Sequence, residues 1–111
     1  MATSGANRGK RPRLVSVSEE MKHMSGLLAR ELSRWPGVSV RKMFGLRAFY
    51  RGTVVFAMLP DKRALENPQA IACKLWEKWQ LCELKNEHDI DKVLVRLDKA
   101  YARAAGRSGK Q

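Results

Sequence analysis

Two cysteines and two histidines are the side chains of this chain best suited to catalysis or metal binding. They are Cys73, Cys82, His23 and His88. The two histidines fall outside the apolar patterns of the predicted helices, which is typical of surface residues rather than of catalytic bases. The two thiols are too few and too widely spaced for a zinc site, even when both histidines are added. We therefore predict no metal site.

Motifs for nucleophilic catalysis and phosphate binding are also not found. Ser18, Ser25 and Ser39 lack the sequence context of a nucleophile elbow. Gly45 and Gly52 are isolated, so they do not form a phosphate-binding loop. The acidic residues are scattered or sit at helix starts, without a paired arrangement. We predict no catalytic residues, no cofactor and no enzymatic activity.

The sequence does offer the chemistry of a basic, aromatic surface. Arg41, Arg47 and Arg51 share a predicted hairpin with Phe49 and Tyr50. Such a β-surface can stack with bases and pair with phosphates of single-stranded nucleic acid. Alternatively, the arginines are ordinary edge-strand charges that suppress aggregation between sheets.

Trp76 adds a second feature of the same kind. It lies at a predicted turn, where an exposed indole ring would mark an interaction surface. Together with Arg41, Arg47, Phe49 and Arg51, it makes up the candidate interaction surface that the sequence predicts.

The net charge of +11 is unevenly distributed along the chain. Basic residues without any acidic residue occupy 1–13 and 103–111, and the N-terminal stretch lacks apolar periodicity. We predict disordered basic tails at 1–15 and 106–111, and a folded domain at 16–105. The tails either bind nucleic acid or an acidic partner, through release of counterions, or simply keep the protein soluble.

The apolar pattern also bears on the cellular location. No apolar stretch follows the N-terminal basic residues as in a secretory signal, and no apolar run approaches the roughly 20 residues of a membrane span. We expect a cytoplasmic protein without membrane association, in which both thiols are reduced.

An amphipathic helix is predicted near each end of the folded region. The first covers 18–34, where Ser16, with capping-box spacing to Glu19, or Ser18 provides the cap. Its apolar stripe repeats every three or four residues and consists of Met21, Met24, Leu28 and Leu32. The last helix is capped by Asn86 and ends at Gly106. Its stripe consists of Ile90, Val93, Leu94, Leu97, Tyr101 and Ala104, and its basic residues Arg96, Lys99 and Arg103 suit the negative end of a helix.

Three strands are predicted between 38 and 59. Gly45 separates the first two and suggests a bulge or a sharp bend, and a turn at Arg51-Gly52 leads into the third. In this third strand the simple alternation places Val54, Phe56 and Met58 on one face. It places Val55, Ala57 and Leu59 on the other. Apolar residues on both faces indicate a central strand.

The segment 68–78 fits two structures. Asn67 followed by Pro68 is typical of a helix start, whereas the alternation of Ile71, Cys73 and Leu75 is typical of a strand. We prefer the strand, with residues 79–84 as its hairpin partner. A two-residue hairpin loop would place Cys73 and Cys82 opposite each other, and a three-residue loop would place them on opposite faces. The resulting α-β-β-β-β-β-α order predicts an α+β fold: a two-layer sandwich in which an antiparallel sheet of about five strands has helices at both chain ends.

One segment resembles a known family. In residues 40–57, Met43-Phe44-Gly45 is followed by a short apolar strand, a Gly turn and a second apolar strand, as in the TfoX N-terminal domain. The segment 79–84 with Asn86-Glu87-His88-Asp89, and the ending Leu97-Asp98-Lys99-Ala100-Tyr101, are similar to the same family, which also has a strand at 68–78. The resemblance covers roughly residues 18–104. It departs at Leu46, where a second Gly is common, and in the short interval between Leu75 and Trp79.

The resemblance implies an α+β fold and a regulatory association, without the second domain that TfoX proteins usually carry. We therefore predict a non-enzymatic regulatory or protein-interaction domain of TfoX N-terminal type with a protein partner. The alternative is a small basic protein that binds nucleic acid through its Arg-rich tails and hairpin.

Overall fold

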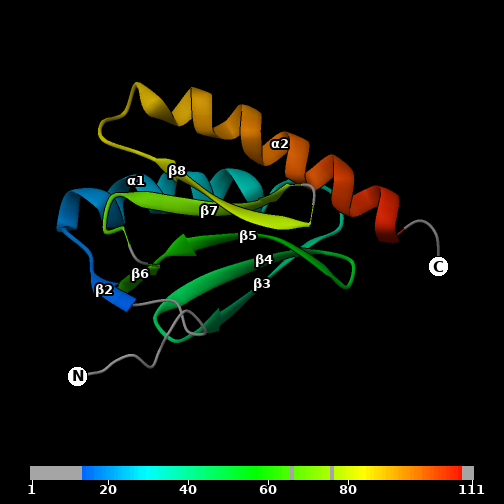
Figure 1. Ribbon diagram of the computed structural model, residues 1–111, viewed down its shortest axis with the longest axis horizontal. Helices are drawn as coiled ribbons and strands as arrows, with labels where there is room; N and C mark the ends of the chain where they lie inside the picture. Colours follow the sequence, from blue (N-terminus) through cyan, green and yellow to red (C-terminus); the bar gives the residue numbers. More distant parts are fainter. Residues whose placement is uncertain (1–13, 66, 76, 109–111) are drawn as a thin grey trace.

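Two helices cover one face of a five-stranded antiparallel sheet in the computed structural model of the chain (Figure 1). The structure describes residues 14–65, 67–75 and 77–108. The elements are β2 (Leu14–Ser16), α1 (Glu19–Leu32), β3 (Val38–Met43), β4 (Leu46–Arg51), β5 (Val54–Pro60), β6 (Arg63–Leu65), β7 (Ala70–Leu75), β8 (Lys78–Glu83) and α2 (Asp89–Ser108). The sheet has the order β3-β4-β5-β7-β8, and β2 pairs with β6 in a separate ribbon. The predicted α+β fold, with an antiparallel sheet of five strands and a helix near each end, is confirmed.

The start of α1 is fixed by a side-chain cap. The Ser18 hydroxyl accepts a hydrogen bond from the Met21 N–H at 3.1 Å, which satisfies one of the free donors of the first turn. Ser16, the other predicted cap, is paired in β2, so the predicted capping box with Glu19 is wrong. The predicted apolar stripe of α1 is fully buried against the sheet.

The hairpin between β3 and β4 turns at Phe44 and Gly45. Met43 pairs with Leu46, so the turn has two residues, and both have positive φ angles, 53° and 81°. A two-residue turn with positive φ at both positions matches the right-handed twist of the two strands that it connects. The Gly45 carbonyl accepts hydrogen bonds from the backbone N–H groups of residues 61–63 at 2.9–3.1 Å. Of the two predicted alternatives at Gly45, a bulge or a sharp bend, the structure shows the sharp bend.

The central strand β5 contains a bulge that the sequence pattern did not reveal. Phe49 pairs with Ala57 and Tyr50 with Val55, so Phe56 is an extra residue on β5. Phe56 and Ala57 both join the core beneath the helices, whereas simple alternation placed them on opposite faces. The predicted faces are wrong beyond this point because a bulge shifts the phase of the alternation by one residue. The predicted central position of the strand is confirmed.

The ambiguous segment forms a strand, β7, and the preferred prediction is confirmed. The sequence has no glycine between β7 and β8, and Glu77 takes the left-handed conformation there with a φ of 70°. Cys73 pairs with Gln80, and Cys82 pairs with Ile71. The two thiols are therefore diagonal neighbours on one face, and both predicted arrangements are wrong because the hairpin has a different register.

The ends of the folded domain differ from the prediction. Residues 14 and 15 belong to β2 and residues 106–108 belong to α2, so neither range is part of a disordered tail. Residues 1–13 and 109–111 lie outside the described part of the chain. α2 begins at Asp89, after a turn in which the Asn86 side chain accepts from the His88 N–H at 2.9 Å. Neither helix in the described ranges is long and apolar enough to cross a membrane.

Candidate anion-binding cleft

The predicted interaction surface divides between the two faces of the sheet. Phe49 is fully buried and belongs to the core. Arg47 faces the same side and pairs with Asp61, with 3.3 Å between Nη2 and Oδ1. Arg51 lies over the ring of Tyr101, with its Cζ 3.8 Å from the ring centroid, and donates to the Tyr101 carbonyl at 3.2 Å. Arg51 thus ties the hairpin to α2, Arg47 ties it to the loop after β5, and burial leaves Phe49 unable to stack with a ligand.

The remaining predicted residues lie elsewhere. Arg41 is exposed on the face away from the helices, with its Cζ 5.6 Å from the centroid of the Tyr50 ring. Trp76 lies outside the described residues. The structure therefore does not gather Arg41, Arg47, Phe49 and Arg51 into one surface.

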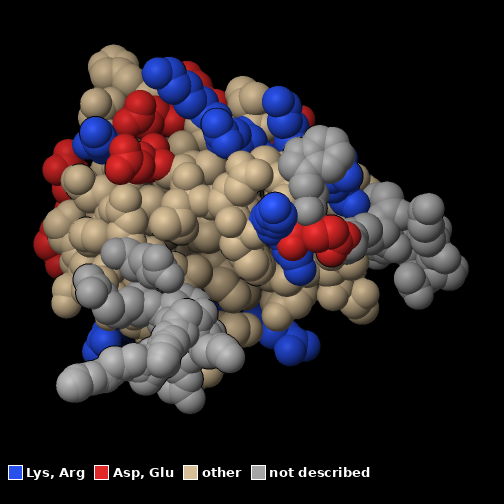
Figure 2. Space-filling view, in the orientation of Figure 1, with Lys and Arg blue, Asp and Glu red and all other residues tan. Residues whose placement is uncertain are grey.

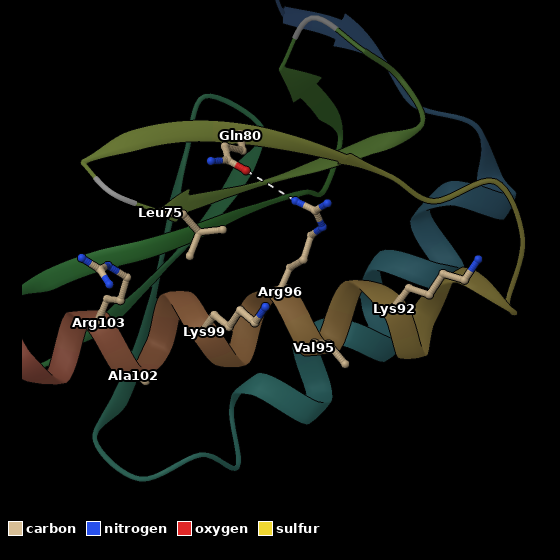
Figure 3. Close-up of a pocket in the computed structure, with 8 residues that line it drawn as sticks. All are labelled: Leu75, Gln80, Lys92, Val95, Arg96, Lys99, Ala102 and Arg103. Carbon is tan, nitrogen blue, oxygen red and sulfur yellow. Dashed lines mark hydrogen bonds between the residues drawn. The ribbon is translucent and has the colours of Figure 1, made fainter.

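A different basic surface follows one side of α2. Its members are Lys92, Arg96, Lys99 and Arg103, called the basic row below, and their side chains rise toward β7 and β8 (Figure 3). The intervals of four, three and four residues place them on one side of a helix. From the sequence, three of these residues were predicted only to suit the negative end of the helix, although their spacing, extended back to Lys92, indicates a shared surface.

The basic row borders a cleft between α2 and the β7–β8 hairpin. The cleft has a volume of about 720 Å³ and is open to solvent. Apolar side chains contribute part of its wall, namely Leu75, Val95 and Ala102. Arg96 reaches across it and donates from Nη1 to Oε1 of Gln80 at 3.4 Å, which links α2 to β8 (Figure 3).

The charges around the cleft are not balanced locally. Among the described residues, Lys92, Arg96 and Lys99 form no ion pair, whereas Lys22, Arg47 and Lys85 each pair with a carboxylate. Asp91 and Asp98 also lie on α2, where they neighbour Val95 at intervals of four and three residues, and neither belongs to the basic row. Figure 2 shows Lys and Arg side chains along the upper rim of the molecule, with Asp and Glu side chains beside them. A carboxylate or phosphate entering the cleft would meet several cations at once.

The two cysteines lie on the same side of the sheet as the cleft. Their Sγ atoms are 3.6 Å apart, and both residues are buried. The hydrogen bond with Cys73 and the nearby Arg96 guanidinium lower the pKa of the Cys82 thiol to about 7, although burial acts in the opposite direction. The same hydrogen bond, together with burial, raises the pKa of Cys73. Because the Arg96 side chain also hydrogen-bonds Cys82 and favours its thiolate, we expect Cys82 to ionise first.

This difference predicts how the thiols react. We expect iodoacetamide to modify Cys82 before Cys73, with a rate that rises as the pH passes through about 7. Arg96→Met should shift this midpoint upward, because it removes a positive charge beside the thiolate. Mass spectrometry of peptides after timed alkylation measures both effects. Equal modification of the two thiols, or a midpoint near the ordinary value of 9.0, would contradict the assignment.

The histidines lie outside the cleft. His23 approaches Glu87 at 3.6 Å, where both side chains are largely exposed, and His88 is exposed before α2 begins. Within the described ranges, no three side chains of His, Cys, Asp or Glu are grouped as metal ligands would be.

Comparisons with known proteins give no assignment. No protein-family model, curated protein or solved structure matches this chain. The resemblance to the TfoX N-terminal domain stays a prediction.

Proposed function

We propose that this protein is a non-enzymatic regulatory or protein-interaction domain of TfoX N-terminal type, acting in the cytoplasm. In this proposal the cleft between α2 and β8 receives acidic side chains of a protein partner. The observation that carries it is the group of cations Lys92, Arg96 and Lys99, which border one cleft without a carboxylate partner in the described residues.

The walls of the cleft favour a protein segment over a small free anion. Val95 is 57% exposed beside the basic row, and Leu75 and Ala102 add further apolar surface. Protein interfaces combine such apolar area with a polar, charged rim. The lining of the cleft supplies guanidinium, ammonium, amide and aliphatic groups. These groups suit binding better than proton transfer near neutral pH.

Charge reversal tests the cleft directly. In the double variant Lys92→Glu, Lys99→Glu, the affinity for a fluorescein-labelled oligoglutamate peptide should fall by more than about tenfold, because attraction becomes repulsion. Fluorescence anisotropy at low salt measures the affinity, and circular dichroism checks that α2 is retained.

The matched control reverses two exposed lysines far from the cleft. Lys42 lies on β3 at the opposite edge of the sheet, and Lys62 lies between β5 and β6. The double variant Lys42→Glu, Lys62→Glu has the same net charge as the test variant and should bind within about twofold of the parent protein. An equal loss in both double variants would show that total charge, rather than the cleft, attracts the peptide.

Nucleic acid is the second candidate ligand. The basic row and the Arg-rich segment 1–13 favour it, because lysine and arginine neutralise phosphates and release counterions. A mobility-shift assay with a single strand of roughly 20 nucleotides tests it, and the affinity should fall steeply with salt. Binding near 0.15 M salt that is tighter for the single strand than for the oligoglutamate peptide would favour nucleic acid over a protein partner.

A further inference from the structure

The strand β8 forms an edge of the five-stranded sheet. It pairs with β7 on one side, and in the described residues no strand pairs with its other side. In an antiparallel pair, alternate residues direct their N–H and C=O groups away from the partner strand. β8 therefore offers a row of main-chain donors and acceptors to another extended segment.

The two edges of the sheet differ in the side chains that they present. The opposite edge strand, β3, exposes Val40 between Ser39, Arg41 and Lys42, and charged residues of this kind protect an edge from pairing. On β8, Trp79 and Leu81 are 41% and 46% exposed. β8 has exposed charged residues only at its two ends, Lys78 and Glu83, so the apolar surface that a docked strand would cover lies at its centre.

The two faces of the β8 edge differ as well. Gln80 and the basic row lie on the helix side, where Gln80 contacts Arg96. Trp79 and Leu81 alternate with Gln80 and therefore lie on the side away from the helices. A strand added beside β8 would direct every second side chain to the basic cleft and the others to Trp79 and Leu81.

We propose that β8 accepts an extended segment of a partner protein as a sixth strand, and that acidic residues alternate with apolar residues in this segment. The inference rests on the proposed function, because it assigns the acidic side chains to the cleft. Main-chain hydrogen bonds would provide affinity, and the alternating side chains would provide specificity, as in other cases of strand addition.

The charge of the basic row favours an acidic partner segment at β8 over a second copy of this chain. Pairing of two β8 strands around a two-fold axis would bring Lys92, Arg96 and Lys99 of both copies to the same side of the joined sheet. Like charges close together oppose association, whereas an acidic segment is attracted. The cleft and the β8 edge are thus both complementary to an extended segment in which acidic and apolar residues alternate.

The experiment uses the full chain and four labelled peptides. The parent peptide is Asp-Val-Asp-Val-Asp-Val-Asp-Val, and the second has the same composition in blocks, Asp-Asp-Asp-Asp-Val-Val-Val-Val. The third and fourth keep the parent sequence but are N-methylated at every Asp or at every Val. Because only alternate N–H groups of a strand face its neighbour, one methylated peptide should lose binding while the other stays within about twofold of the parent.

The expected loss is at least about tenfold for that methylated peptide and for the block peptide, as the loss of two or more hydrogen bonds implies. Trp79→Ser should also weaken binding of the parent peptide, whereas Arg41→Ser, on the opposite edge strand β3, should not. Equal affinities for the parent and both methylated peptides would overturn strand addition. A stable dimer in light scattering that the parent peptide does not dissociate would also overturn it, in favour of a second copy.

The same measurements separate the two proposals. If neither the oligoglutamate peptide nor the parent peptide binds even at low salt, the proposed function fails; if only the oligoglutamate peptide binds, strand addition alone fails. If the parent peptide binds, if the double variant Lys92→Glu, Lys99→Glu abolishes this binding, and if N-methylation does not change the affinity, the cleft remains the binding site. In that case only the strand addition fails.

Discussion

Gly45→Ala is expected to lower the free energy of unfolding by on the order of 3 kcal/mol, a large effect for the addition of one methyl group. Gly45 has a φ of 81°, where residues with a β-carbon are strained. A β-carbon built there would lie 2.5 Å from Cγ and 3.0 Å from Cβ of Arg63. Relief would move the Gly45 carbonyl, which holds the N–H groups of residues 61–63.

A matched control is available in α1. Gly26 has no atom within 4 Å of the position of a β-carbon, and it lies inside a helix. Gly26→Ala should therefore raise stability by about 0.5–1 kcal/mol, since alanine favours helices more than glycine does. Urea titration of both variants gives the comparison. Effects of the same sign would show that Gly45 has no special backbone role.

Gly45 also shows what the sequence could predict. A lone glycine between two alternating segments indicated a turn or bulge, because local chain chemistry decides that feature. The contact with Arg63 was beyond prediction from this pattern. It depends on the loop after β5 folding back over the turn, which only the tertiary structure determines.

The bulge in β5 marks a second limit. Alternation identified the strand and its central place, but one extra residue at Phe56 reversed the assignment of the residues after it. Register caused the same error in the β7–β8 hairpin, where the positions of Cys73 and Cys82 depended on which residues formed the turn. Element types were therefore more predictable than the faces on which side chains lie.

The candidate site was the least predictable feature. The arginines of the hairpin are conspicuous in the sequence, yet Arg51 packs on Tyr101 of α2 and Arg47 pairs with Asp61 in the loop after β5. Lys92, Arg96 and Lys99 resemble an ordinary solvated helix face. They border a cleft only because the β7–β8 hairpin lies beside α2, and this arrangement is a tertiary feature without a local signal.

Phe56→Ala is expected to lower the free energy of unfolding by about 3–5 kcal/mol, as for other buried aromatic residues truncated in a packed core. The Phe56 side chain is 1% exposed, and its ring meets Tyr101 of α2 edge-on with 5.6 Å between centroids. Tyr101 in turn packs against Trp35 at 4.9 Å and donates its hydroxyl to the Pro36 carbonyl. The truncation would leave a cavity beneath α2 and loosen this cluster.

Phe44→Ala is the matched control for this substitution. It removes the same atoms from a ring that is 78% exposed at the tip of the β3–β4 hairpin, so stability should change by no more than about 0.5 kcal/mol. Denaturant titration of both variants, with equal slopes, isolates the contribution of burial. A loss below about 1 kcal/mol for Phe56→Ala would mean that the bulge does not hold its ring in the core. Because α2 packs on that ring and carries the basic row, Phe56→Ala should also weaken peptide binding, whereas Phe44→Ala should not.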